Sequence, residues 1–207
     1  MKEPKITVIV PVYNTADLVI RALDSIPIDD ETQLIIVDDG STDGSWPLIL
    51  DWWGKHYTGT GSIIHHWNDN RGVAAAMNLG FNLARGEYIV SLSSDDYYVD
   101  NFDKFKPYLD GVNDLIYFDL QIDNGEIWHL DEENKKVCVG AVKFIRRDFL
   151  GQTRVPDMKW CEDKPFSYEL YDKNPKEIFT GILLKHYSYP RVGSLSWQCR
   201  EEENGRN

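Results

Sequence analysis

The chain has 207 residues, of which 42% are hydrophobic and 27% charged, a composition that excludes a mainly disordered protein and fits one globular domain. Its 22 basic and 34 acidic residues give a formal net charge of −12. This charge opposes general binding to the phosphate backbone of nucleic acids. It does not exclude a nucleotide held by a few placed groups or by a metal ion.

Cysteine content and apolar patterning bear on the compartment. The three cysteines, Cys138, Cys161 and Cys199, are odd in number and lack the spacing of a zinc site, which favours a reducing compartment. No apolar run approaches the roughly 18 residues of a membrane-spanning helix. The first apolar run is broken by Pro11 and is too short for a signal peptide. We therefore expect a cytoplasmic protein, and peripheral contact with a membrane stays open.

The first half of the chain alternates between strand-like and helix-like segments. The strands are β-branched runs typical of a buried parallel sheet, and the helices show apolar residues at helical spacing. Thr15 is the expected N-cap of the first helix, and Pro47 falls in the first turn of the second. Such alternation predicts right-handed βαβ units. The expected elements are a strand at 6–12, a helix at 15–26, a strand at 33–37, a helix at 45–53, a strand at 62–65, a helix at 73–84 and a strand at 87–92.

The pattern is less regular in the second half. Residues 114–120 and 136–145 predict strands, with the hairpin signal Asn124-Gly125 between them. We expect a single α/β domain whose mostly parallel sheet is flanked by helices and gains a small antiparallel addition from this half. The remaining expectations are a helix at 164–171, a mixed segment at 178–189 and a frayed tail at 201–207.

Three polar clusters directly follow expected strands. They are Pro11-Val12-Tyr13-Asn14, Asp38-Asp39-Gly40-Ser41 and Ser93-Ser94-Asp95-Asp96. Because ligands of parallel α/β sheets bind beyond the carboxyl ends of the strands, these clusters should share one rim. A single Asp-Asp pair is most often a turn or a helix cap. Two pairs at one rim favour a divalent cation, Mg²⁺ or Mn²⁺, which would also bridge a diphosphate.

The segments VIVPVYN, VDDGSTDGS and NDNRGVAAAMNLGFNLARGEYIVSLSSDD occur in this order over residues 6–98. Together they resemble the nucleotide half of the family 2 inverting glycosyltransferases with the GT-A fold. Weaker similarity continues through residues 160–163 and 191–196. The resemblance implies one domain over 1–207, with a nucleotide-sugar-binding half at 1–98, an acceptor and catalytic half at 99–200 and the tail at 201–207.

The resemblance implies a set of residues that bind the nucleotide. Pro11 and Tyr13 match the first-strand motif that holds the base, and Asp39 matches the acceptor for the ring N–H of uracil. Arg71 precedes the alanine-rich helix and is the natural cation for a phosphate, with a solvated surface arginine as the alternative. Asp38 either joins this set or only anchors its turn. Asn78 is expected to fix a loop through side-chain hydrogen bonds.

The metal motif departs from the Asp-x-Asp-Asp form common in the family, because Ser93 replaces the first carboxylate. In the remaining motif, Ser94 and Asp95 are assigned to the nucleotide, with Asp95 near the ribose and the metal. Asp96 is assigned as the direct metal ligand. The alternative is that both aspartates only cap the segment that follows.

Glu162-Asp163 matches the catalytic Glu-Asp element of the family, with Asp163 as the base that deprotonates the acceptor hydroxyl. The alternative is a helix N-cap ahead of Lys164-Pro165. Trp160 is a candidate for stacking on an acceptor sugar, and residues 191–196 for supplying a cation to the phosphates.

These assignments predict a metal-dependent inverting glycosyltransferase that takes a sugar from a nucleotide donor, for which a UDP-sugar is the expected choice. The sugar would be moved to a hydroxyl group of a glycan, lipid-linked or other acceptor. One alternative is a non-catalytic relative that binds the nucleotide-sugar without transfer. A sugar nucleotidyltransferase is the weaker alternative, because residues 10–14 lack the glycine-rich, basic loop of that class. Homo-oligomerisation stays open.

Overall fold

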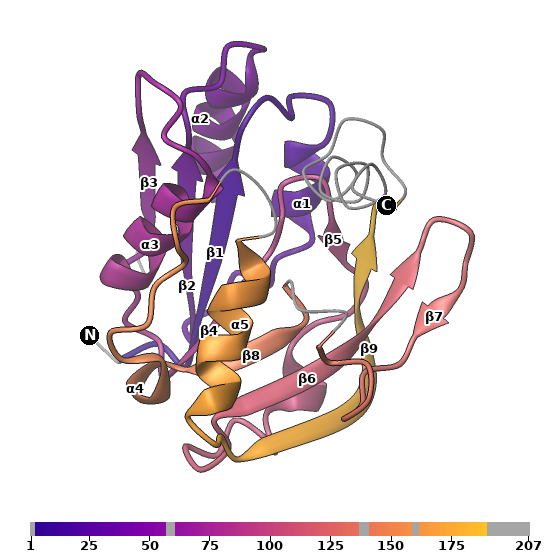
Figure 1. Cartoon of the computed structure of the whole chain (residues 1–207). Helices are drawn as coiled ribbons and strands as arrows, with labels where there is room; N and C mark the ends of the chain where they lie inside the picture. Colours follow the sequence, from indigo (N-terminus) through magenta and orange to yellow (C-terminus); the bar gives the residue numbers. More distant parts are fainter. Residues whose placement is uncertain (1–2, 57–60, 137–140, 159–161, 190–207) are drawn as a thin grey trace, which may run out of the picture.

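The structure, a computed structural model, describes residues 3–56, 61–136, 141–158 and 162–189 (Figure 1). These residues form a nine-stranded sheet in the order β3-β2-β1-β4-β8-β6-β9-β5, with β7 paired to β6. The strands are β1 (Ile6–Val12), β2 (Thr32–Asp38), β3 (Ile63–His66), β4 (Tyr88–Ser91), β5 (Tyr97–Tyr98), β6 (Leu115–Ile122), β7 (Ile127–Trp128), β8 (Lys143–Arg146) and β9 (Glu177–Tyr187). The helices are α1 (Val19–Asp24), α2 (Ser45–His56), α3 (Val73–Leu83), α4 (Arg147–Leu150) and α5 (Asp163–Asp172), with a 3₁₀ turn η1 at Asp103–Phe105.

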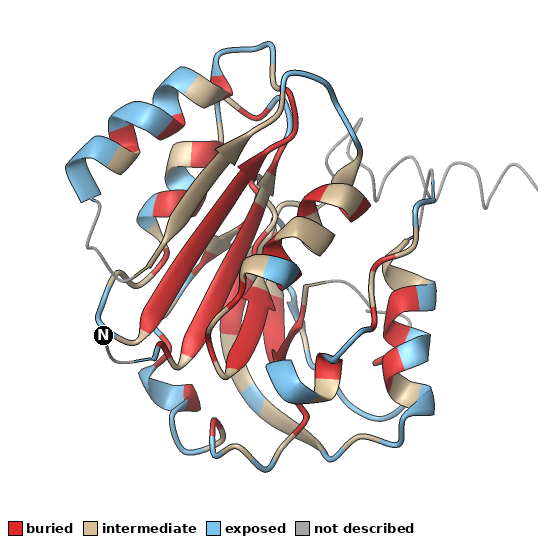
Figure 2. Ribbon diagram, turned by 90° about the vertical axis from the view of Figure 1, so that its left-hand side faces the viewer, coloured by how far each residue is buried: buried red, intermediate tan, exposed pale blue. Residues whose placement is uncertain are grey.

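Strands β3, β2, β1 and β4 are parallel, which confirms the predicted βαβ organisation. Every residue of β2 is buried, as are all residues of β1 except the half-buried Pro11. Figure 2 shows these strands as the buried centre of the molecule, with exposed residues on the outer faces of the helices. The β-branched runs thus form strands because both of their faces are covered.

Helices cover both faces of this parallel part. Helices α1 and α2 contact each other, and the Trp52 indole donates a hydrogen bond to Asp24 Oδ1 at 2.7 Å. The chain then crosses from the edge strand β3 to β4, on the far side of β1. Because such crossovers are right-handed, α3 lies on the face opposite to α1 and α2. Phe81 of α3 stacks on Phe166 of α5 at 5.5 Å, so α5 shares the face of α3.

The second half supplies the antiparallel addition that the sequence predicts. Strand β8 is antiparallel to both β4 and β6, whereas β9 is parallel to β6. The predicted strand at 136–145 is shorter, since β8 begins at Lys143 and residues 137–140 lie outside the described part. Asn124-Gly125 does form a hairpin turn, but the turn joins β6 to the short β7 rather than to β8.

The first helix differs from its prediction. It begins at Val19, and the Thr15 side chain does not cap it. The Thr15 hydroxyl instead donates to Ser94 Oγ at 2.9 Å, while its carbonyl accepts from the Leu18 and Val19 amides. Thr15 therefore connects the loop after β1 to the loop after β4.

Among the described residues, no helix has the length and apolar character needed to cross a bilayer. All three cysteines, the tail at 201–207 and residues 191–196 lie outside the described residues. The reducing compartment and the cytoplasmic location therefore stay predictions.

Candidate active site

The loops after β1, β2 and β4 meet at one rim of the sheet, as their positions after parallel strands predict. The Asn14 amide donates to Ser41 Oγ at 2.9 Å, and the Thr42 amide donates to Asn14 Oδ1 at 2.8 Å. The Thr15–Ser94 bond adds the third loop. Asn14 has a φ of 51°, a left-handed conformation that asparagine tolerates better than most residues. The three polar clusters therefore form one continuous surface.

Asp39 organises a fourth segment at this rim. Its carboxylate accepts hydrogen bonds from the backbone amides of Arg71 at 2.6 Å and Gly72 at 2.8 Å. Burial raises the pKa of Asp39, and these two amide bonds oppose the rise. Gly40, at a φ of 76°, lies so close that a Cβ atom would come within 2.8 Å of the Asp69 backbone. Only glycine is compatible with this packing, which holds the segment before α3 against the loop after β2.

Asp38 faces a different neighbourhood from Asp39. Its side chain is fully buried, and His66 Nδ1 lies 2.6 Å from Oδ2. The His66 ring stacks on Trp46 at 4.8 Å between centroids. The Ser41 amide also donates to Asp38 Oδ2 at 3.3 Å. These contacts support the reading of Asp38 as an anchor of its turn.

The other residues assigned to the nucleotide differ in exposure. Tyr13 is 47% exposed, and Pro11 is half-buried. Arg71 is exposed, with its guanidinium group 4.9 Å from the centroid of the Trp67 ring. Tyr13 and Arg71 are therefore accessible to a ligand at the rim, and their roles stay predictions.

The two aspartates of the metal motif have different environments. Asp96 is 1% exposed, and Lys185 Nζ of β9 lies 3.2 Å from its Oδ2. The Ser188 amide donates to its Oδ1 at 2.9 Å. Asp96 is thus buried and already bound by an ammonium group and a backbone amide, and its assignment as the direct metal ligand stays a prediction. The half-buried Asp95 is the more accessible member of the pair.

The backbone of Asp95 is held by residues that sequence reasoning missed. Its carbonyl oxygen accepts from Arg21 Nη2 at 2.7 Å and from Ser188 Oγ at 2.6 Å. Arg21 also lies over the Tyr97 ring, 4.6 Å from its centroid. No local sequence pattern marks these residues, because α1 and the end of β9 are distant in the chain. No group of three or more His, Cys, Asp or Glu side chains able to hold a metal occurs among the described residues.

Glu162 and Asp163 lie at the start of α5, with Asp163 as its first residue. This end of α5 is at the same side of the molecule as the carboxyl end of β1 (Figure 1). Both carboxyl groups are half-buried, and burial raises the pKa of each. A carboxylate of raised pKa is a better proton acceptor, which suits a general base. Trp160 lies outside the described residues.

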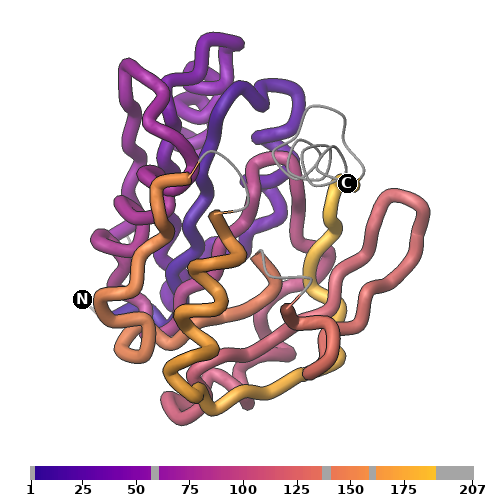
Figure 3. The backbone as a smooth tube through the Cα atoms, viewed as in Figure 1, coloured from indigo at the N-terminus to yellow at the C-terminus, as the bar shows by residue number. Residues whose placement is uncertain are grey.

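Asn78 of α3 fixes the loop that leads to α5. Its Nδ2 donates to the Val155 carbonyl at 2.8 Å, and the Val155 amide donates to its Oδ1 at 2.9 Å. Figure 3 shows this orange segment running beside α3. The pair of bonds confirms that Asn78 holds a loop, and it links α3 to the segment that leads to Asp163.

The chain matches a family model and several proteins named as glycosyltransferases. The family model described as "Glycosyl transferase family 2" matches residues 7–180. An uncharacterized glycosyltransferase of Mycoplasma genitalium is 32% identical over 200 residues, which cover 91% of this chain and 63% of that protein. A poly(ribitol-phosphate) beta-glucosyltransferase of Bacillus spizizenii is 39% identical over 98 residues, covering 45% of this chain and 15% of that protein. The chain thus spans less than two thirds of the length of these relatives.

Solved structures share the fold. TarS 1–349 of S. aureus in complex with UDP-GlcNAc has a TM-score of 0.75 and 21% identity, covering 92% of this chain and 60% of that one. A mannosyltransferase from Pyrobaculum calidifontis in complex with GDP-Man and Mn²⁺ has a TM-score of 0.69 and 19% identity, covering 100% of this chain and 66% of that one. These matches confirm the predicted α/β fold.

Proposed function

Because the chain belongs to glycosyl transferase family 2, we propose that it transfers a sugar from a UDP-sugar to an acceptor hydroxyl, with inversion at the anomeric carbon. One observation carries the proposal. The loops after β2 and β4, which bear Asp39 and Asp95, meet at one rim, and the amino end of α5, which begins at Asp163, points toward the carboxyl end of β1 in Figure 1. This arrangement supports a donor site and a proton acceptor at the same end of the parallel strands.

In the proposed reaction, Tyr13 contacts the uracil ring and Asp39 accepts its N3–H. A carboxylate has about four acceptor positions, so the bonds from the Arg71 and Gly72 amides leave Asp39 capacity for a third donor. The Arg71 guanidinium group and the backbone amides in the first turn of α3 present positive charge to the diphosphate. Asp163 removes the proton of the acceptor hydroxyl as its oxygen attacks the anomeric carbon, and the bond to the diphosphate breaks.

A divalent cation is part of the proposal. Magnesium-type sites in nucleotide-binding proteins commonly use one or two carboxylates together with substrate phosphates, so Asp95 would hold the ion without a larger protein cluster. When bound, the cation would neutralise the charge that develops on the leaving diphosphate. Asp96 would act only through Lys185 and Ser188, by fixing the segment that carries Asp95.

The test of the donor site is calorimetric titration with UDP and with CDP, each with and without Mn²⁺. We expect UDP to bind more tightly than CDP, and Mn²⁺ to strengthen both. Asp39→Asn should weaken UDP binding by about 10- to 100-fold, because a hydrogen bond to a charged acceptor is lost. It should also narrow the preference for UDP over CDP, since cytosine N3 accepts rather than donates.

The matched control is Asp69→Asn, which changes an exposed carboxylate in the adjacent loop and should leave both affinities unchanged. Equal weakening of UDP and CDP in Asp39→Asn would show that Asp39 only holds the loop at residues 70–72. Negligible binding of either nucleotide, with or without Mn²⁺, would contradict the donor site. If UDP does bind, hydrolysis assays with UDP-glucose, UDP-galactose and UDP-GlcNAc distinguish an enzyme from a relative that only binds the donor.

A further inference from the structure

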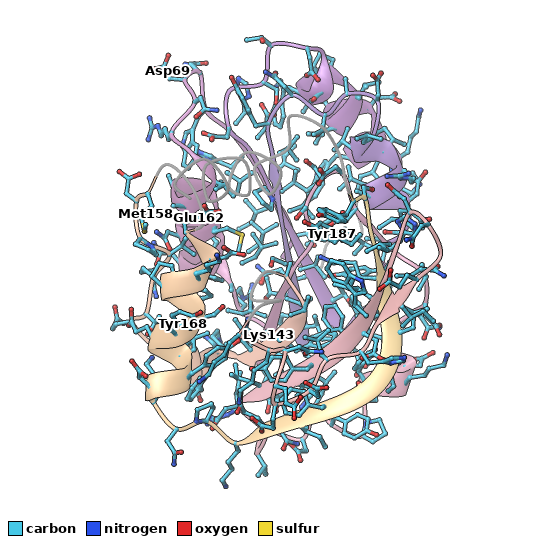
Figure 4. All side chains as sticks on the ribbon, turned by 45° about the vertical axis from the view of Figure 1, so that its right-hand side comes forward. Asp69, Lys143, Met158, Glu162, Tyr168 and Tyr187 are labelled. Atoms are coloured by element: carbon cyan, nitrogen blue, oxygen red, sulfur yellow. The ribbon has the colours of Figure 1, made fainter. Side chains whose placement is uncertain are left out.

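A buried lysine lies beneath the first turn of α5. Lys143 of β8 is 4% exposed, and its Nζ donates to Ser167 Oγ of α5 at 3.1 Å. Asp163 and Ser167 are four residues apart, so both lie on the face of α5 that packs toward β8. Figure 4 shows Lys143 in the interior beside α5, with Glu162 at the upper end of the same helix. The amine thus lies within about one helical turn of Asp163.

Aromatic rings and carboxylates around Lys143 favour its charged form, whereas burial opposes it. Its Nζ is 5.9 Å from the centroid of the Tyr117 ring and 5.8 Å from that of Tyr171, distances at which aromatic faces attract a cation. Burial lowers the pKa of Lys143 to about 8, while Asp163 and Glu177 oppose the decrease. The amine is therefore mostly protonated at neutral pH.

Of the two carboxylates near Lys143, Glu177 already has other partners. Its Oε1 accepts from the Tyr117 hydroxyl at 2.7 Å, and its Oε2 from Lys135 Nζ at 2.5 Å. Lys135 Nζ also lies 2.7 Å from Glu132 Oε2, so Glu177 is bound by the Tyr117 hydroxyl and by an ammonium group shared with Glu132. Burial raises the pKa of Asp163, and among the groups that lower it Lys143 has the largest effect.

We propose that Lys143 is a positioning residue whose buried ammonium group keeps Asp163 ionised and thereby able to accept a proton. The inference rests on the proposed function, in which Asp163 is the base. Among the described residues, the charged groups that also act on Asp163 include its chain neighbours Glu162 and Lys164. Glu162 disfavours a second negative charge, and Lys164 is half-buried at the edge of the site. Lys143 is the cation that approaches Asp163 from within the fold.

The test measures the titration of Asp163 directly, by NMR of protein labelled with ¹³C at the aspartate carboxyl carbons. Asp163→Asn identifies the resonance. In Lys143→Met, the titration midpoint of Asp163 should rise by about one pH unit or more, because an opposite charge nearby is removed. The hydrolysis rate of the best UDP-sugar of the panel should also be measured against pH. The midpoint of the acidic limb of this profile should move to higher pH by the same amount.

The matched control is Ser167→Ala, which removes the acceptor of the Lys143 hydrogen bond but keeps the charge, and should leave both midpoints within about 0.3 unit of wild type. Lys143→Gln replaces Lys143→Met if the latter does not fold. An Asp163 midpoint that stays within 0.3 unit in the lysine variant overturns the proposal. A midpoint that rises while the pH profile does not move supports the coupling of the two groups and overturns the assignment of Asp163 as the base.

Discussion

Asp163 is the residue on which the proposed chemistry depends most directly. Asp163→Asn keeps the size and polarity of the side chain but removes its ability to take a proton. We expect kcat to fall by about 10²- to 10⁴-fold, the usual contribution of a general base. The affinity for UDP should stay unchanged, because the side chain meets the acceptor rather than the nucleotide. Steady-state hydrolysis and calorimetry measure the two quantities separately.

Glu162→Gln is the natural control, since Glu162 is the adjacent carboxyl group and burial raises its pKa as well. It should reduce kcat much less than Asp163→Asn does. Turnover within a few-fold of wild type in Asp163→Asn would show that the base is another residue. Glu162 and then Asp157, in the loop ahead of α5, would be the next candidates.

Among the elements of the fold, α3 connects the proposed nucleotide-binding rim to the helix that carries the proposed base. Its amino end follows the segment that Asp39 holds, and Asn78 within it makes both hydrogen bonds to Val155. The stack of Phe81 on Phe166 adds a direct contact with α5. A disturbance of α3 should therefore displace the base relative to the donor site.

Asn78→Ala removes both bonds to the Val155 backbone. We expect the free energy of unfolding to fall by about 1–3 kcal/mol, since a donor and an acceptor of the loop lose their partner. We also expect a lower kcat at unchanged UDP affinity, because the loop leads to α5 and not to the nucleotide. Urea unfolding followed by circular dichroism measures the first effect, and hydrolysis of the donor the second.

The comparison for this variant is Asn82→Ala on the same helix. Asn82 Oδ1 accepts from Arg154 Nη2 at 2.7 Å on the surface of the protein. Its removal should change the free energy of unfolding by about 0.5 kcal/mol or less. If both substitutions lower the free energy of unfolding equally, the two bonds to Val155 stabilise the fold no more than the surface bond of Asn82 does.

At the scale of the whole molecule, a buried ion pair joins the two halves of the chain. Asp96 and Lys185 are 89 residues apart, and their side chains are 1% and 4% exposed. Ser188 and Arg21 add bonds around the same segment. Strand β9 and the residue that follows it, Ser188, thus fasten the loop after β4, whose Asp95 carries the proposed metal-binding role.

Lys185→Met leaves the buried charge of Asp96 without its cation. We expect a loss of about 3–5 kcal/mol in the free energy of unfolding, measured by urea denaturation. Replacing both residues, as Asp96→Asn with Lys185→Met, should recover part of this loss, because no charge is then left unpaired. Lys104→Met, at the exposed pair with Asp100, should leave the unfolding midpoint nearly unchanged. A double variant as unstable as the single one would contradict the unpaired-charge explanation.

Local sequence patterns are sufficient to predict the parallel part of the sheet and the position of its polar rim. Buried strands such as β1 and β2 are local β-branched runs, and in a parallel sheet the residues after each strand share one edge. The positions of Asp39 and Asp95 at that edge follow from these local signals alone. The helix that begins at Asp163 was predicted to within one residue, because its apolar residues keep helical spacing.

The partners of these residues follow from contacts between segments that are distant in the chain. The sequence predicts that Asp96 binds a metal, and only the structure shows that Lys185 and Ser188 bind its carboxylate. Asn124-Gly125 marks a hairpin without showing that its second strand is β7. Lys143 faces α5 only because β8 is inserted between β4 and β6. Such pairings depend on packing between segments that are distant in sequence. Local periodicity carries no information about this packing, and therefore the charges around Asp96 and Asp163 are seen only in the folded molecule.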